Sequence, residues 1–252
     1  MPALFIGHGS PMNAIEDNYF TKNWEKIANE IPKPTAILAI SAHWYTLGSR
    51  ITDATQPKMV YDMYGFPQEL YEIAYPAMGS LKLAHETKNL IKAKVEIDNS
   101  WGYDHGTWSV LCKMYPEADI PVYQLSLDRQ ASAEAHFQIG QEISILRDQG
   151  VLILGSGNVV HNLAKINWEM DQGYPWAIEF DSYIENSIKN QAYEKVVNYQ
   201  AAGKSAEIAF VTPEHYLPLL YVLGAARADD QLSIYNDACI LGSMSMTSYV
   251  FK

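Results

Sequence analysis

Two hydrophobic periods alternate along the chain. Short, continuous apolar runs are typical of strands buried on both faces, whereas apolar residues three or four positions apart are typical of amphipathic helices. The clearest strand is Ala36–Ser41, which leads into His43, and the clearest helix carries Trp24, Ile27 and Ile31 on one face. The continuous runs predict strands at 3–6, 36–41, 94–97, 121–127, 151–154 and 208–211. Alternation of apolar and polar residues predicts two edge strands at 231–236 and 245–251. The spaced patterns predict helices at 20–31, 83–91, 107–114, 133–146 and 176–188, and one that begins at Pro213.

Strands and helices alternate from end to end, which predicts an α/β fold with helices flanking one mixed central sheet. We find no internal repeat, low-complexity tract or linker, so residues 1–252 are expected to form a single domain. Thr107 is expected to cap the helix that follows it. Residues 50–79 are irregular and rich in tyrosine. A long aromatic segment of this kind is either a lid or pocket wall, or a packed surface loop.

The composition suits a compact protein with a sizeable core, since 48% of the residues are hydrophobic and 19% are charged. The net charge of -11 argues against a nucleic-acid partner, which would require basic patches. Cys112 and Cys239 are expected to be buried free thiols, because two cysteines are too few for a disulfide framework. We find neither a signal peptide nor an apolar run of about 18 residues. We therefore expect a cytoplasmic protein without a membrane partner, as a monomer or small homo-oligomer.

Five of the seven histidines stand in turns rich in glycine, serine or proline: His8, His43, His105, His161 and His215. All but His105 follow an apolar, strand-like run. The carboxyl ends of parallel strands form the edge of the sheet where ligands bind, and imidazole is the commonest protein ligand of transition metals. The pattern therefore predicts that these rings converge on a cation. His85 and His136 lie in predicted helices, and we expect a solvated and a structural role for them, respectively.

Several other groups lie near these turns. Asp104 and Glu214 each precede one of the five histidines, and either could be a metal ligand or an acceptor that orients a ring. Glu214 is also a favourable acidic residue in a first helical turn. Residues 155–158, Gly-Ser-Gly-Asn, resemble an anion-binding nest. The aromatic residues near the turns could wall a flat substrate or simply fill the core: Trp44, Trp101, Tyr103, Trp108 and Tyr216.

Five motifs together resemble one enzyme family. They are HGSP at 8–11, SAHW at 41–44, WGYDHGTW at 101–108, GSGNVVHN at 155–162 and TPEHYLPL at 212–219. They resemble the class III (LigB-like) extradiol ring-cleavage dioxygenases, and within them the branch of the 4,5-DOPA extradiol dioxygenases. The resemblance implies one non-haem metal ion at which a catechol ring is opened with O2.

The resemblance also implies roles for the five histidines. His8, His43 and His215 would hold the metal. His161 would be a fourth ligand or the acid–base residue, and His105 would be a second acid–base and hydrogen-bonding group. A nearby imidazole can accept and later donate a proton close to neutral pH.

An all-histidine site suits Zn(II) as well as Fe(II), whereas the broader class uses two histidines and a carboxylate. We therefore expect Fe(II) for ring cleavage and zinc in some preparations of the purified protein. Two further hypotheses remain at this point. One is a zinc-dependent hydrolase on the same scaffold, and the other is a non-enzymatic binding protein of that fold.

Overall fold

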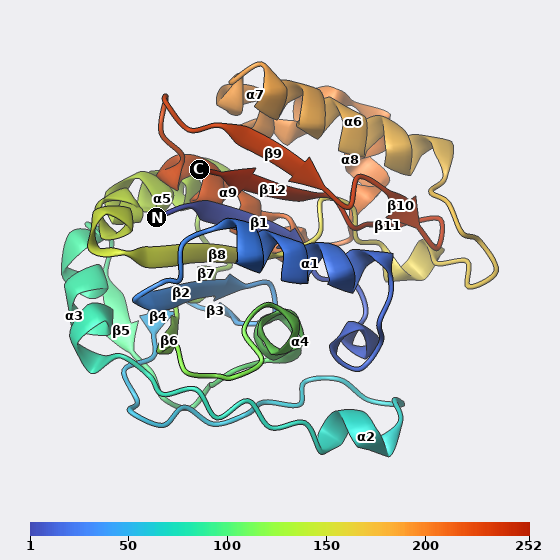
Figure 1. Cartoon of the computed structure of the whole chain (residues 1–252). Helices are drawn as coiled ribbons and strands as arrows, with labels where there is room; N and C mark the ends of the chain where they lie inside the picture. Colours follow the sequence, from blue (N-terminus) through green and yellow to red (C-terminus); the bar gives the residue numbers. More distant parts are fainter.

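The computed structural model describes residues 1–252 and is built around a six-stranded mixed sheet (Figure 1). The strand order is β6 (Val122–Gln124), β2 (Ala36–Ser41), β8 (Val151–Gly157), β1 (Ala3–Gly7), β12 (Ser248–Phe251) and β9 (Leu232–Tyr235). The first four are parallel to one another, whereas β12 runs antiparallel to both β1 and β9. The predicted α/β fold with a mixed central sheet and flanking helices is therefore confirmed.

The remaining strands form three short pairs. They are β3 (Tyr45–Thr46) with β7 (Leu127–Asp128), β4 (Ser49–Ile51) with β5 (Val95–Ile97), and β10 (Cys239–Ile240) with β11 (Met244–Ser245). The α-helices are α1 (Tyr19–Glu30), α2 (Gln68–Tyr71), α3 (Leu81–Leu90), α4 (His105–Met114), α5 (Ala133–Ile143), α6 (Pro175–Lys189), α7 (Tyr193–Val197), α8 (Lys204–Ala209) and α9 (Leu217–Ala225). None of these helices combines the length and the apolar character that a membrane crossing requires.

Each face of the sheet has its own hydrophobic core, and this explains the continuous apolar runs. In β2, Leu38 and Ile40 belong to the core that includes α5, α6 and α9, whereas Ile37 and Ala39 belong to the core that includes α1 and α4. Figure 1 shows α1 and α4 on the opposite side of the strands from α5 and α9. Because both faces of the parallel strands are covered, every residue of β2 is apolar or small and buried.

Two predicted strands differ from the structure. Residues 208–211 do not form a strand, because residues 208 and 209 are the last two of α8, Lys204–Ala209, and Phe210 makes only an isolated bridge with His161. Lysine, alanine and glutamate favour the helix there, and a short apolar run alone does not distinguish a strand from a helix. The edge strand predicted at 245–251 corresponds to β12, Ser248–Phe251, which lies inside the sheet between β1 and β9. Of the two predicted edge strands, only the one that corresponds to β9 is at an edge.

Two local predictions are also wrong. The cap of α4 is Asp104, whose side chain accepts a hydrogen bond from the backbone N–H of Thr107. Residues 155–157 do not form an anion-binding nest, because they belong to β8 and pair with β1 and β2 on either side. Their backbone groups are used by the sheet, so they are not available to a ligand.

Candidate metal centre

Three histidines meet at the carboxyl edge of the parallel strands. His8 directly follows β1, His43 lies two residues beyond β2, and His215 ends a short 3-10 helix at Pro213–His215. One side-chain nitrogen from each lies within 4.8 Å of the other two. Nε2 of His8 is 3.2 Å from Nε2 of His43. Two nitrogens bound to one metal at about 2.1 Å lie about 3.0–3.4 Å apart, so this spacing fits a shared ion.

The orientation of His8 follows from its contact with Ser156 at the end of β8. The hydroxyl of Ser156 donates its single proton to the carbonyl oxygen of Gly106, at 2.5 Å. Its oxygen, 2.9 Å from Nδ1 of His8, must therefore accept a hydrogen bond from that nitrogen. The neutral ring then carries its proton on Nδ1 and presents the lone pair of Nε2 to the cluster.

His43 is oriented in the same way by a carboxylate. Nδ1 of His43 lies 3.0 Å from Oδ2 of Asp62, and an ionised carboxylate can only accept. In the neutral form of His43 the lone pair of Nε2 then faces the lone pair of Nε2 of His8. Such a pair fits a cation, which the two nitrogens would hold jointly.

His215 is brought to the cluster by the end of β8. The backbone N–H of Asn158 donates to the carbonyl oxygen of His215 at 2.8 Å. A Cβ at Gly157 would lie 2.0 Å from the same oxygen, so only glycine permits this approach. Nδ1 of His215 is 3.4 Å from Oε1 of Glu214, so Nε2 is the nitrogen available to a metal. Each of the three imidazoles thus has an oxygen beside Nδ1.

The environment keeps two of these rings neutral. Burial lowers the pKa of His8 well below its usual value, and the nearby imidazoles lower it further. Burial likewise lowers the pKa of His215, and the charge of the adjacent His161 acts in the same direction. A neutral imidazole is the form that binds a metal, so the protonation state suits the geometry.

Asp62 and His43 affect each other. Burial opposes the charge on His43, but the contact with Asp62 and the charge of Asp104 outweigh it and raise the pKa of His43. Burial would raise the pKa of Asp62, whereas its contacts with His105 and His43 hold that pKa below its usual range. The carboxylate is therefore ionised and acts as an acceptor.

His161 and His105 complete the cluster on two sides. The ring of His161 stacks on the ring of His215, with centroids 3.5 Å apart and planes 7° apart. The nitrogens of His161 do not belong to the group of three that lie within 4.8 Å of one another. Burial, followed by the charges of His43 and His105, lowers the pKa of His161 to about 3. The ring of His105 lies 3.8 Å from that of His43, and its pKa is lowered by burial and by His43. All five predicted histidines are therefore neighbours.

Asp104 lies outside this group. Its carboxylate accepts hydrogen bonds from the hydroxyl of Ser41 at 2.6 Å, from the backbone of Thr107 and from the side chains of Trp101 and Gln124. Asp104 therefore holds the strand end and the start of α4 together.

The other predicted residues have the following surroundings. His85 is exposed and contacts Asp53, whereas His136 is buried and contacts the hydroxyl of Tyr221. Both cysteines are free, but Cys112 is only half-buried. These four positions take no part in the cluster.

Two residues of the site were not found from the sequence. Asp62 belongs to the irregular segment 50–79, where no periodicity assigns a direction to a side chain. Its only signal is an acidic residue among apolar and aromatic neighbours, Val60 to Tyr64. Ser156 was interpreted as part of a nest, whereas its side chain, not its backbone, contacts the site.

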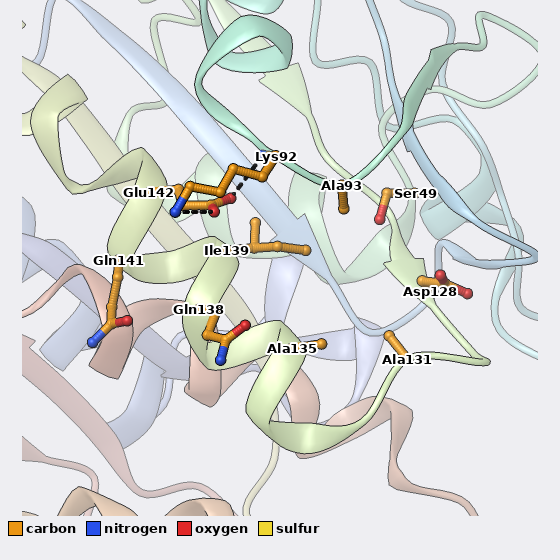
Figure 2. A pocket seen from close by; sticks show the side chains of 10 residues that line it. All are labelled: Ser49, Lys92, Ala93, Asp128, Ala131, Ala135, Gln138, Ile139, Gln141 and Glu142. Carbon is orange, nitrogen blue, oxygen red and sulfur yellow. Dashed lines mark hydrogen bonds and ion pairs between the residues drawn. The ribbon is translucent and has the colours of Figure 1, made fainter.

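A hollow of about 570 Å³ lies elsewhere, among the start of β4, residues 92–93 and α5. Figure 2 shows the residues that line it, which include no histidine. Lys92 and Glu142 pair across it, with Nζ 3.6 Å from Oε1. This hollow is therefore separate from the place where the imidazoles converge.

Comparison with known proteins gives consistent matches over the whole chain. Residues 2–252 match the family model described as the catalytic LigB subunit of aromatic ring-opening dioxygenase. The 4,5-DOPA dioxygenase extradiol of Escherichia coli strain K12 is 45% identical, with 98% of this chain and 93% of the relative covered. Its namesake in Beta vulgaris is 39% identical, with 98% and 95% covered. The crystal structure of an uncharacterised protein from Escherichia coli K12 has a TM-score of 0.87 at 42% identity, with 100% of both chains covered.

Proposed function

The chain belongs to the family of the catalytic LigB subunit of aromatic ring-opening dioxygenases, and we propose that it is an extradiol dioxygenase that opens a DOPA-like catechol ring with O2 at one divalent metal ion. Relatives named 4,5-DOPA dioxygenase extradiol support the substrate class. The observation that carries the proposal is the convergence of three imidazole nitrogens within 4.8 Å, each ring with an oxygen beside Nδ1.

In this proposal His8, His43 and His215 hold the metal through Nε2. When bound, the ion would leave positions for a catechol and O2 and would lower the pKa of a catechol hydroxyl. The chain itself supplies the orientation of these ligands through Ser156 and Asp62. Fe(II) is the proposed metal for ring cleavage, and the all-imidazole set also accepts Zn(II).

Proton transfer falls to the two remaining imidazoles. His161 is half-buried and neutral, and its ring lies flat on a proposed ligand rather than within the group of three nitrogens. We assign His161 as the acid–base residue. The alternative is that it is a fourth ligand of the metal. His105 is buried beside His43 and is proposed as the second acid–base and hydrogen-bonding group.

The test is oxygen uptake by protein loaded anaerobically with Fe(II), on L-DOPA and a panel of other catechols. We expect one O2 consumed per catechol and a yellow ring-opened product. His161→Ala should lose both while it retains the metal, which would also separate the acid–base role from a ligand role. Absence of oxygen uptake with every catechol would contradict the proposal.

A zinc-dependent hydrolase is the second candidate, because three imidazoles are also a zinc ligand set. Ester or amide hydrolysis that persists with zinc and not with iron would select it. A protein that binds no metal at physiological concentrations would instead be a non-enzymatic binding protein.

A further inference from the structure

Asp62 contacts two imidazoles that have different proposed tasks. Its Oδ2 lies 3.0 Å from Nδ1 of His43, and its Oδ1 lies 3.1 Å from Nδ1 of His105. Oδ1 also accepts a hydrogen bond from the backbone N–H of His105 at 2.9 Å. The Asp62 side chain is only 12% exposed, so the carboxylate has little contact with water. One carboxylate therefore lies at ion-pair distance from a proposed metal ligand and from a proposed acid–base residue at the same time.

The segment that carries Asp62 is fixed to the segment that carries His105. The backbone N–H of Val60 donates to the carbonyl oxygen of Tyr103 at 2.7 Å, and that of Tyr103 donates to Lys58 at 2.9 Å. The indole N–H of Trp108 donates to the carbonyl oxygen of Val60 at 3.1 Å. At Gly102 an added Cβ would lie 1.9 Å from the carbonyl oxygen of Lys58, so the two segments are in close contact. Asp62 is therefore anchored through the residues just before it, Lys58 and Val60.

We propose that Asp62 is the positioning residue of the site, which fixes the Nδ1–H form of both His43 and His105. This inference deepens the proposed function and rests on it. In His43 the Nδ1–H form directs the lone pair of Nε2 to the metal. In His105 the same form leaves Nε2 as the proton acceptor. Metal binding and proton transfer thus depend on one carboxylate from residues 50–79.

An asparagine at this position would serve only one of the two rings. Its single carbonyl oxygen can accept from one Nδ1–H, whereas its NH2 group would face the other Nδ1 as a donor. That other ring would be driven to the Nε2–H form. His43 in this form cannot bind the metal, and His105 in this form cannot accept a proton.

The experiment compares Asp62→Asn with the wild type in two measurements. The first is Zn(II) affinity, measured by competition with a chromophoric chelator. The second is kcat and KM for L-DOPA, or for the best catechol of the panel, at saturating Fe(II). We expect the Zn(II) Kd to rise about 10–100-fold, as for other groups that orient metal ligands, and kcat to fall at least about tenfold. KM should change little, because Asp62 reaches the substrate only through the histidines.

Asp53→Asn is the matched control. Asp53 belongs to the same segment and contacts a histidine, His85, at 3.0 Å, but His85 lies outside the cluster. This variant should retain wild-type Zn(II) affinity and kcat. Thermal unfolding of both metal-free variants measures general damage to the fold. A purely structural role for Asp62 would produce such damage without the separate changes in Kd and kcat.

A measurement on the wild type keeps the inference testable if Asp62→Asn does not fold. The 15N chemical shifts of the imidazoles in the Zn(II)-loaded protein distinguish Nδ1–H from Nε2–H, and both His43 and His105 should be Nδ1–H. The inference is overturned if either ring is Nε2–H, or if either Kd or kcat of Asp62→Asn stays within about twofold of wild type. The Kd and the 15N shifts need no substrate, so failure to cleave any catechol would count against the proposed function alone.

Discussion

Single hydroxyl and carboxylate groups decide which nitrogen each imidazole presents to the cluster. Ser156 illustrates this most simply, because its one proton is committed to the carbonyl oxygen of Gly106 and its oxygen must accept from His8. The hydroxyl thus acts on the candidate metal site through the ring of His8. Groups of this kind orient metal ligands and raise their basicity, and their loss weakens metal binding.

Ser156→Ala is expected to weaken Zn(II) binding about 10–100-fold, because His8 would lose the acceptor that keeps its proton on Nδ1. The measurement is chelator competition at pH 7. Ser109→Ala is the control, since Ser109 is equally buried but its hydroxyl has no hydrogen-bond partner. Equal affinities for the two variants would contradict the assigned role of Ser156.

At this scale the sequence predicted the histidines and named Glu214, which lies beside Nδ1 of His215, but it did not predict the groups beside Nδ1 of His8 and His43. His8 and His43 could be found because each follows a long buried strand, and the direction of a parallel strand fixes where its end lies. Asp62 could not be found, because its position depends on hydrogen bonds between residues 58–60 and Tyr103, which are far apart in sequence and follow no period. Ser156 lies in a predicted region, but which of its groups faces the site depends on the packing of three segments.

Between elements, a buried carboxylate joins α6 to the connection between β11 and β12. Asp181 accepts hydrogen bonds from the hydroxyls of Ser245 at 2.6 Å and Thr247 at 2.7 Å. Burial raises the pKa of Asp181 from 3.8 to about 6, although these two hydrogen bonds act in the opposite direction. The ionised form is therefore disfavoured in the folded protein relative to the unfolded chain.

This shift predicts a fall in stability as the pH rises from about 4 to about 6. In that window the folded protein still binds a proton that the unfolded chain has released, so the free energy of unfolding decreases with pH. A shift of about two pH units corresponds to roughly 3 kcal/mol. Asp181→Asn lacks this contribution. The measurement is urea unfolding at pH 4 and pH 7. Between these pH values the free energy of unfolding of the wild type should fall by roughly this amount more than that of the variant. Parallel pH dependences of the two proteins would contradict the prediction.

Elements were predictable where a single period extends over several turns or a whole strand. The helix at 20–31 and the strand at 36–41 agree with α1 and β2 because their patterns are long and uninterrupted. The strand predicted at residues 208–211 was wrong because a four-residue apolar run suits either the strand period or the helix period. The inner position of β12 could not be read from its sequence, since the register of its neighbours β1 and β9 is a long-range property.

Across the whole molecule, the topology of the sheet brings together residues that are distant in sequence. β1 and β2 lie on either side of β8, so their carboxyl ends present His8 and His43 next to Ser156. The carbonyl oxygen of His215 is held against the residues that follow β8, more than 50 positions earlier in the chain. A metal bound by these three histidines would therefore link the ends of the N-terminal strands to the segment before α9.

A metal ion that binds the folded chain and not the unfolded chain must raise the melting temperature. At a free Zn(II) concentration of about 100 times Kd, the added stability is about 2.7 kcal/mol. For a chain of this size each kcal/mol moves the melting temperature by roughly 2–4 °C, so we expect a rise of roughly 5–10 °C over protein treated with EDTA.

His43→Ala should lose most of this rise, because it removes one of the three converging nitrogens. His85→Ala removes an exposed imidazole outside the cluster and should keep the rise in full. Equal Zn(II)-dependent shifts in the two variants would mean that zinc stabilises the fold at some other position, and the three histidines would then lose their assignment as its ligands.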